Sequence, residues 1–152
     1  MEMIPLAQQT VLPPEIGGLR VQIRILVADD YPAVRRGVRA VLETQAGWKV
    51  VAEAENGQQA LQQAREHIPD IAVIDISMPL MNGLELAREL RAALPTTEIL
   101  ILTQHTSRGM LEQAVQAGAR GYVVKSAVAS ELIPAVEAVL QHQAFVSSDV
   151  ET

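Results

Sequence analysis

Residues 71–83 read IAVIDISMPLMNG. The apolar run Ile71–Ile76 contains a single charged residue, Asp75, close to its end. Runs with so few polar residues are typical of strands buried on both faces, as in a parallel sheet covered by helices. A carboxylate in such a strand needs a partner, because an isolated buried charge is costly. We therefore predict a buried strand here, with Asp75 as a candidate functional residue.

Similar apolar runs occur four more times, at Ile23–Ala28, Val50–Ala54, Ile99–Leu102 and Tyr122–Val124. The stretches between and after the runs have apolar residues at helical spacing, and the last helix has Ser130 as its candidate N-cap. Strands that alternate with helices imply parallel strands and right-handed crossovers. The predicted fold class is therefore α/β, a (βα)₅ doubly wound open parallel sheet with strand order 2-1-3-4-5, since five strands are too few for an eight-stranded barrel.

The composition excludes several classes of protein. The 152 residues are 49 % hydrophobic and 20 % charged, with a net charge of −6 and no cysteine. Disulfides and thiolate metal sites are excluded, and the acidity argues against nucleic-acid binding by this segment. No apolar run approaches the ~18 residues of a membrane span, and Met1–Gln9 does not resemble a signal peptide. We expect a cytoplasmic protein without a membrane partner.

The chain divides into a domain and two flanking segments. Residues 1–20 are rich in proline and glycine without a clear period, which predicts a flexible N-terminal extension with no regular element. Residues 23–143 contain all five strand–helix units. Residues 144–152 come after the last unit and are predicted to begin a linker helix, with no further domain in this chain.

Polar residues follow the apolar runs at the carboxyl ends of the predicted strands, where sites form in open α/β sheets. These residues are Asp29, Asp30, Asp75, Thr103 and Lys125. The first and third strands are neighbours in the predicted order, so the three carboxylates should converge. Three close carboxylates repel one another, and a proton or a cation must relieve the repulsion.

This donor set suggests a particular chemistry. Oxygen ligands with open positions suit Mg²⁺, which commonly also binds phosphate oxygens. Lys125 and Thr103 could bind two further oxygens of a phosphoryl group, and an aspartate can itself be the nucleophile. Each residue alone has a simpler explanation: Asp30 could be a helix N-cap, and Lys125 a solvated lysine at a strand end. The functional interpretation depends on all five residues occurring together.

The sequence resembles a response-regulator receiver domain of two-component signalling. The resemblance spans residues 23–143 and depends on four motifs: ILVADD from Ile25, DISMP from Asp75 with Asn82-Gly83, Leu102-Thr103, and GYVVK from Gly121. The stretches DYPAVRRG from Asp30 and GARGY from Gly118 resemble the NarL/LuxR-type branch. The resemblance implies a flavodoxin-like fold, phosphoryl transfer from a sensor histidine kinase, and no enzymatic turnover beyond self-catalysed aspartyl phosphorylation and dephosphorylation.

The resemblance also implies a role for each site residue. Asp75 is the phosphoacceptor, and it holds Mg²⁺ together with Asp29, Asp30 and the backbone carbonyl of Ser77. Thr103 is the switch hydroxyl, Lys125 contacts the phosphoryl group, and Tyr122 is the switch aromatic. The response surface is formed by the fourth helix, the fifth strand and the fifth helix. Ser77 and His105 are hypothesised to flank the path of attacking water, although His105 could equally be an exposed loop residue.

Relatives of this type carry a C-terminal helix-turn-helix domain that binds DNA, which implies such a partner domain in a full-length protein, and two copies of a receiver can pair as a homodimer. Three other interpretations remain. A pseudo-receiver would bind partners without phosphate. A Mg²⁺-dependent phosphohydrolase would normally have a second aspartate at position 77, where this chain has serine. A flavodoxin-like cofactor binder would need a phosphate-binding loop where Asp29 and Asp30 stand.

Overall fold

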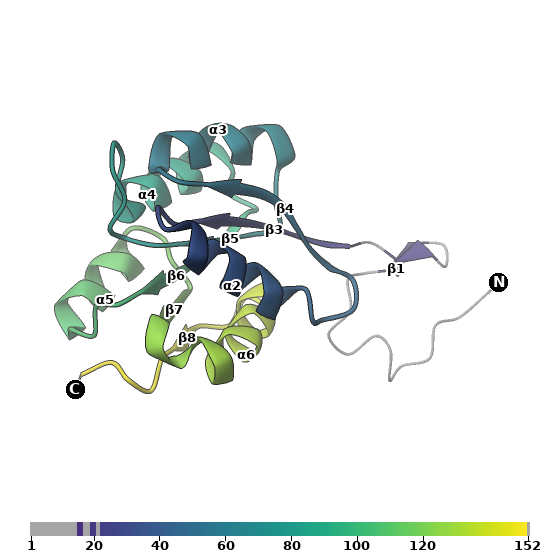
Figure 1. Ribbon diagram of the computed structural model, residues 1–152. Helices are drawn as coiled ribbons and strands as arrows, with labels where there is room; N and C mark the ends of the chain where they lie inside the picture. The colour runs from purple at the N-terminus through teal and green to yellow at the C-terminus, as the bar shows by residue number, and fades with distance from the viewer. Residues whose placement is uncertain (1–14, 17–18, 21, 152) are drawn as a thin grey trace.

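The computed structural model describes residues 15–16, 19–20 and 22–151. In these residues, five helices and a parallel sheet form three layers (Figure 1). The helices are α2 (Pro32–Leu42), α3 (Gly57–His67), α4 (Gly83–Ala93), α5 (Arg108–Gln116) and α6 (Val128–Leu140), with a 3₁₀ turn η1 (Lys125–Ala127) before α6. The strands of the main sheet are β3 (Ile23–Ala28), β4 (Trp48–Ala54), β5 (Ile71–Ile74), β6 (Glu98–Thr103), β7 (Gly121–Val124) and β8 (Phe145–Val146).

The sheet has the strand order β4-β3-β5-β6-β7-β8, with every neighbouring pair parallel. Its first five strands confirm the predicted order 2-1-3-4-5. Helices α3, α4 and α5 bury apolar residues against one face, and α2 and α6 cover the other (Figure 1). Since both faces are covered, strands such as β5 are completely buried and read as continuous apolar runs. The predicted α/β fold class is therefore confirmed.

Three details differ from the predictions. The strand predicted over Ile71–Ile76 ends at Ile74, so Asp75 lies just beyond the strand rather than inside it. Helix α6 begins at Val128, after η1, so Ser130 lies inside the helix and is not its N-cap. The prediction that a linker helix begins after residue 143 is wrong for the described residues, because Phe145–Val146 pairs with β7 as a sixth strand.

The extension is described only in part. Residues 1–14, on which most of the predicted flexible extension falls, lie outside the described residues. The strands β1 (Glu15–Ile16) and β2 (Leu19–Arg20) pair antiparallel in a small separate sheet, where the prediction had no regular element. Among the residues that the structure describes, no helix combines the length and apolarity needed to cross a bilayer.

Candidate functional site

The three acidic residues predicted to converge lie together at the carboxyl edge of the sheet. Asp29 and Asp30 follow β3, and Asp75 follows the neighbouring strand β5. Each can place one carboxylate oxygen within 4.8 Å of the others. Asp29 and Asp75 are buried, with 2 % and 3 % of their surface exposed, and Asp30 is partly buried. The topology therefore concentrates negative charge where little water can screen it.

Lys125 is the cation that faces this cluster. It follows β7, and its Nζ lies 2.7 Å from Asp29 Oδ2 and 3.2 Å from Asp75 Oδ2. Burial raises the pKa of Asp75 above its ordinary value, and this effect exceeds the opposing attraction of Lys125. Burial lowers the pKa of Lys125, but the hydrogen bond to Asp29 and the charge of Asp75 outweigh it and leave that pKa raised. One lysine therefore compensates the carboxylates only in part.

Two oxygens of the cluster are buried without a hydrogen-bond partner among the described residues: Asp30 Oδ1 and Asp75 Oδ1. Asp29 Oδ1 accepts the backbone N–H of Tyr31 at 2.9 Å. The N-cap of α2 is Tyr31, followed by Pro32 in the first turn, so the alternative role of Asp30 as an N-cap does not hold. Buried polar atoms are normally satisfied, and partnerless carboxylate oxygens fit a hard divalent cation such as Mg²⁺.

Close backbone packing fixes the loop that carries Asp75 and Ser77. A Cβ added at Gly83 would lie 2.1 Å from the carbonyl oxygen of Asp75, and one at Gly57 would lie 2.1 Å from that of Met81. Gly83 begins α4, whose N-cap Asn82 forms a reciprocal capping box with Glu85. In the sequence, Asn82 and Gly83 stand out only as part of a motif. Their role in holding Asp75 depends on this close approach, which no spacing reveals.

The predicted switch residues are joined through His105. The buried Thr103 accepts the backbone N–H of His105 through Oγ1 at 3.2 Å, and Tyr122 Oη donates to the His105 carbonyl at 2.9 Å. Burial raises the pKa of Tyr122 to about 12, so the phenol keeps its proton. The side chain of Ser77 lies 3.3 Å from Nε2 of His105. Thr103 is thus bonded within its own loop, and His105 connects it to Ser77 and Tyr122.

Arg35 is a supporting residue to which the sequence analysis gave no role. Its Nη1 donates to the backbone carbonyl of Asp29 at 2.6 Å, and its Nε pairs with Glu53 at 3.3 Å. Arg39, one turn later on α2, also pairs with Glu53, at 2.9 Å, and does not contact Asp29. The spacing of the two arginines, one turn apart on α2, could have indicated a shared partner. That partner, Glu53 on β4, is identified only by the fold.

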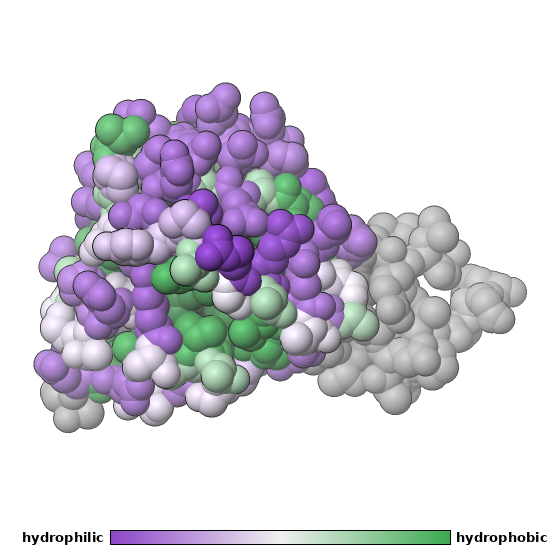
Figure 2. Space-filling model, viewed as in Figure 1, coloured by the Kyte–Doolittle hydropathy of each residue, from purple (hydrophilic) through white to green (hydrophobic). Residues whose placement is uncertain are grey.

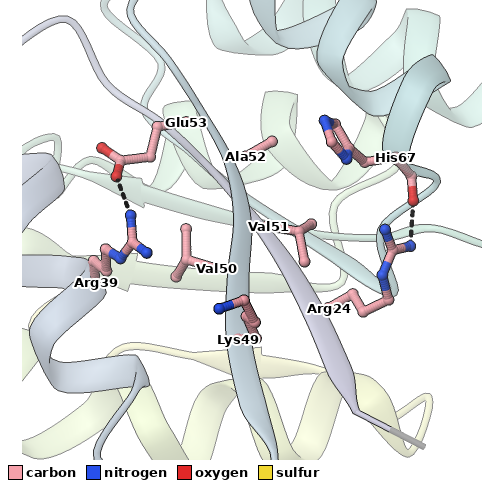
Figure 3. Close-up of a pocket in the computed structure, with 8 residues that line it drawn as sticks. All are labelled: Arg24, Arg39, Lys49, Val50, Val51, Ala52, Glu53 and His67. Carbon is pink, nitrogen blue, oxygen red and sulfur yellow. Dashed lines mark hydrogen bonds and ion pairs between the residues drawn. The ribbon is translucent and has the colours of Figure 1, made fainter.

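A cavity of about 500 Å³ lies elsewhere, along the exposed edge of β4 (Figure 3). Its lining includes Arg24, Lys49 and His67, and none of the clustered carboxylates. Arg24 donates to the backbone carbonyl of His67, and Arg39 pairs with Glu53 (Figure 3). Because these two arginines already have partners, the carboxylate cluster remains the stronger candidate site.

Comparisons with known proteins agree with this geometry. The family model of the response regulator receiver domain matches residues 25–137. The chain is 37 % identical over 128 residues to the response regulator UvrY of Escherichia coli K12, and the match covers 84 % of this chain and 59 % of UvrY. It is 36 % identical over 128 residues to the transcriptional activator protein ExaE of Pseudomonas putida, covering 84 % of this chain and 60 % of ExaE. The chain thus spans less than two thirds of these relatives.

Solved structures give the same result. A LuxR-family two-component response regulator from Aurantimonas superposes with a TM-score of 0.81 and 40 % identity, covering 85 % of this chain and 92 % of that one. The receiver domain of a NarL response regulator from Mycobacterium tuberculosis gives 0.76 and 34 %, covering 81 % and 99 %. This chain belongs to the response regulator receiver domains of two-component systems, and its relatives are regulators of the LuxR and NarL type.

Proposed function

We propose that Asp75 accepts a phosphoryl group from a sensor histidine kinase and that Asp29, Asp30, Asp75 and the backbone carbonyl of Ser77 hold the required Mg²⁺. One observation carries this proposal: Asp75 Oδ1 and Asp30 Oδ1 are buried without hydrogen-bond partners in the described part of the chain, beside a lysine that already contacts two carboxylates. A merely structural cluster would satisfy those oxygens. An incoming phosphorus atom and a cation give both oxygens a partner.

The transfer is a displacement at phosphorus. A carboxylate oxygen of Asp75 forms the new P–O bond as the bond from phosphorus to the donor's imidazole nitrogen breaks, and the electron pair of that bond remains on the donor. Lys125 already lies 3.2 Å from Oδ2 of Asp75, within reach of a phosphoryl oxygen. Mg²⁺, when bound, neutralises charge on the phosphoryl oxygens. These groups therefore promote formation of the aspartyl phosphate at Asp75, and the same neutralised phosphorus can afterwards be attacked by water, which breaks the P–O bond, releases inorganic phosphate and restores the carboxylate.

The proposed response runs through Thr103 and Tyr122 to the surface formed by α5, β7 and α6. The hydroxyl of Thr103 now accepts from the His105 amide, and a phosphoryl group on Asp75 would compete for that hydroxyl. Turning the hydroxyl changes the loop whose carbonyl binds Tyr122. Since ExaE is a transcriptional activator, we propose that this chain, in the cytoplasm, controls a DNA-binding helix-turn-helix domain of a longer protein.

Pairing of two copies is part of the proposal. Figure 2 shows apolar surface gathered beside α2, on the side where α6 lies. Both helices carry partly buried apolar residues that pack against the core between them and the sheet, including Val34, Val41, Val128 and Ile133. A homodimer through α2 and α6 would cover them. Sedimentation of the chain before and after phosphorylation measures whether such a dimer forms.

The test of the phosphoacceptor is intact mass after incubation with Mg²⁺ and acetyl phosphate. The chain should gain one labile phosphoryl mass, with none in Asp75→Asn and none in the presence of EDTA. Asp70→Asn is the matched control, because Asp70 precedes the same strand β5 at its opposite end and accepts the amide of Arg24. It should be phosphorylated like the parent. A folded, Mg²⁺-binding parent that gains no mass would refute the proposal and favour a phosphate-independent pseudo-receiver.

A further inference from the structure

The segment Phe145–Glu151, which we call the C-terminal strap, is seated on the outer edge of the sheet. The amide of Phe145 donates to the carbonyl of Arg120 at 3.1 Å, and that of Ser147 donates to the carbonyl of Tyr122 at 2.8 Å. These bonds add β8 as a parallel neighbour of β7. Ser147 is only 3 % exposed. A polar residue buried at a sheet edge indicates a specific seat rather than a loosely attached end.

Glu131 of α6 holds the middle of the strap. Its carboxylate accepts the hydroxyl of Ser147, and it also accepts the hydroxyl and the amide of Ser148 at 2.7 and 3.2 Å. Hydrogen bonds to a charged acceptor are stronger than neutral ones. Ser126 of η1, the residue after Lys125, donates its hydroxyl to the carboxylate of Asp149 at 3.1 Å. The strap is therefore tied to the response surface by side chains as well as by backbone.

The end of the strap reaches the loop that contains the switch residues. The amide of Glu151 donates to the carbonyl of Thr106 at 2.8 Å, and the hydroxyl of Thr106 lies 3.1 Å from Oε2 of Glu151. The preceding residue, His105, donates its amide to Thr103 and accepts the hydroxyl of Tyr122. Adjacent residues of one short loop thus bond to the switch threonine and to the strap.

We propose that the edge of β7, with Glu131 and Thr106, is an interaction surface for the chain's own C-terminal strap, and that phosphorylation of Asp75 loosens the strap at Thr106. When the hydroxyl of Thr103 turns to the phosphoryl group, the His105 amide loses its acceptor and the loop shifts away from Glu151. Phe145 stays paired with Arg120. The coupling half of this inference rests on the proposed function, whereas the seat itself does not.

The seat is tested by residue-resolved amide exchange in the full chain. Glu131→Gln removes the charged acceptor, so the amides of Ser147 and Glu151 should exchange at least about tenfold faster. Ser148→Ala removes one of the bonds and should give a smaller increase. Glu137→Gln is the matched control, because it makes the same change on the same helix and takes part in none of the strap's contacts. Unchanged exchange in Glu131→Gln would show that no such seat exists.

The coupling is tested with Mg²⁺ and beryllofluoride as the phosphoryl analogue. Saturation should speed exchange of the Glu151 amide about fivefold and leave that of Phe145 unchanged. Coupling is reciprocal, so Glu131→Gln should bind beryllofluoride more tightly than Glu137→Gln does. If beryllofluoride binding shifts the amide resonances around Asp75 but leaves the exchange rate of the Glu151 amide unchanged, the coupling is refuted and the proposed function is not. If beryllofluoride does not bind at all, the proposed function fails, and the coupling fails with it.

Discussion

The two edges of the same sheet differ in whether their acidic side chains have partners. At the amino edge, Glu98 pairs with Arg120, and Asp70 accepts the backbone amide of Arg24, so both acidic side chains have a partner. At the carboxyl edge, Lys125 is the only ion-pair partner of the three carboxylates among the residues that the structure describes. The strands β3, β5, β6 and β7 contribute to both edges. The fold therefore does not itself require unbalanced charge at a strand end.

The acidic side chains at the amino edge are paired, although the indole N–H of Trp48, which begins β4, is buried without a partner among the described residues. Glu98 is only 6 % exposed, and its carboxylate binds Arg120 at 3.0 Å and His142 at 2.7 Å. The buried Thr97 donates to the carbonyl of Pro69 at 2.7 Å. Asp70 accepts the amide of Arg24 at 2.8 Å. The carboxyl edge instead leaves Asp30 Oδ1 and Asp75 Oδ1 without partners in the described part of the chain. Paired charges hold the structure, and the unpaired carboxylate oxygens mark the site where we propose that a cation binds.

Replacing the lysine of the carboxyl edge should have the largest effect on stability. In EDTA, Lys125→Met leaves Asp29 and Asp75 without their cation and should lower the free energy of unfolding by about 3 kcal/mol. Mg²⁺ should restore much of this loss, because it binds only the folded cluster. Urea unfolding with and without Mg²⁺ measures both values. Lys49→Met, at the chain's other lysine, is the exposed control. Equal losses in the two variants would contradict the comparison.

A charge removed from the amino edge should have a smaller effect that does not depend on metal. Glu98→Gln weakens the contacts to Arg120 and His142, and Arg120 is half-exposed and can be solvated. We expect a loss of about 1.5 kcal/mol in the free energy of unfolding. Thermal unfolding with EDTA and with Mg²⁺ should give the same difference from the parent. A loss that Mg²⁺ reverses would mean that the two edges do not behave differently.

The arginines of α2 separate support of the site from support of the fold. Arg35→Gln loses the bond to the Asp29 carbonyl and should weaken Mg²⁺ binding about tenfold, since residues that position metal ligands have effects of this order. Arg39→Gln loses a pair with the same partner, Glu53, but leaves Asp29 untouched and should bind Mg²⁺ like the parent. Calorimetric titration of both variants decides this. Equal Mg²⁺ affinities in the two variants would show that Arg35 does not support the site.

The smallest effect should be a gain in stability. Burial raises the pKa of Asp75, so the ionised carboxylate destabilises the folded state at pH values above that pKa. In EDTA, Asp75→Asn should therefore stabilise the chain by about 1 kcal/mol near neutral pH. As the pH falls through the raised pKa, Asp75 takes up its proton and the gain in stability should shrink. The gain should vanish at pH values below the pKa of an aspartate in the unfolded chain, about 3.9. Urea unfolding across this range would contradict the account if the gain stayed constant.

The sequence was sufficient for the strand order and the acidic cluster because both follow from local pattern. Five apolar runs mark buried parallel strands, and the residues after them must share one edge of the sheet. Arg35 was missed because the fold alone places its guanidinium between the Asp29 carbonyl and Glu53, which lies 18 residues away. Strand β8 was missed because its two residues carry no pattern. It is held by the bond of Phe145 to Arg120 and by the bonds of the following residue, Ser147, to Tyr122 and Glu131. Long-range contacts of this kind have no local signal.

The most direct test of the unbalanced carboxyl edge is a Mg²⁺ titration followed at the backbone amides. We predict saturable shifts around Asp29–Tyr31 and Asp75–Ser77 and none around Asp70 and Glu98. Asp30→Asn should weaken the binding at least about tenfold, whereas Asp70→Asn should leave it unchanged. No saturable shifts in the parent, or equal affinity in the two variants, would contradict the claim that the unpaired carboxylates are a cation site.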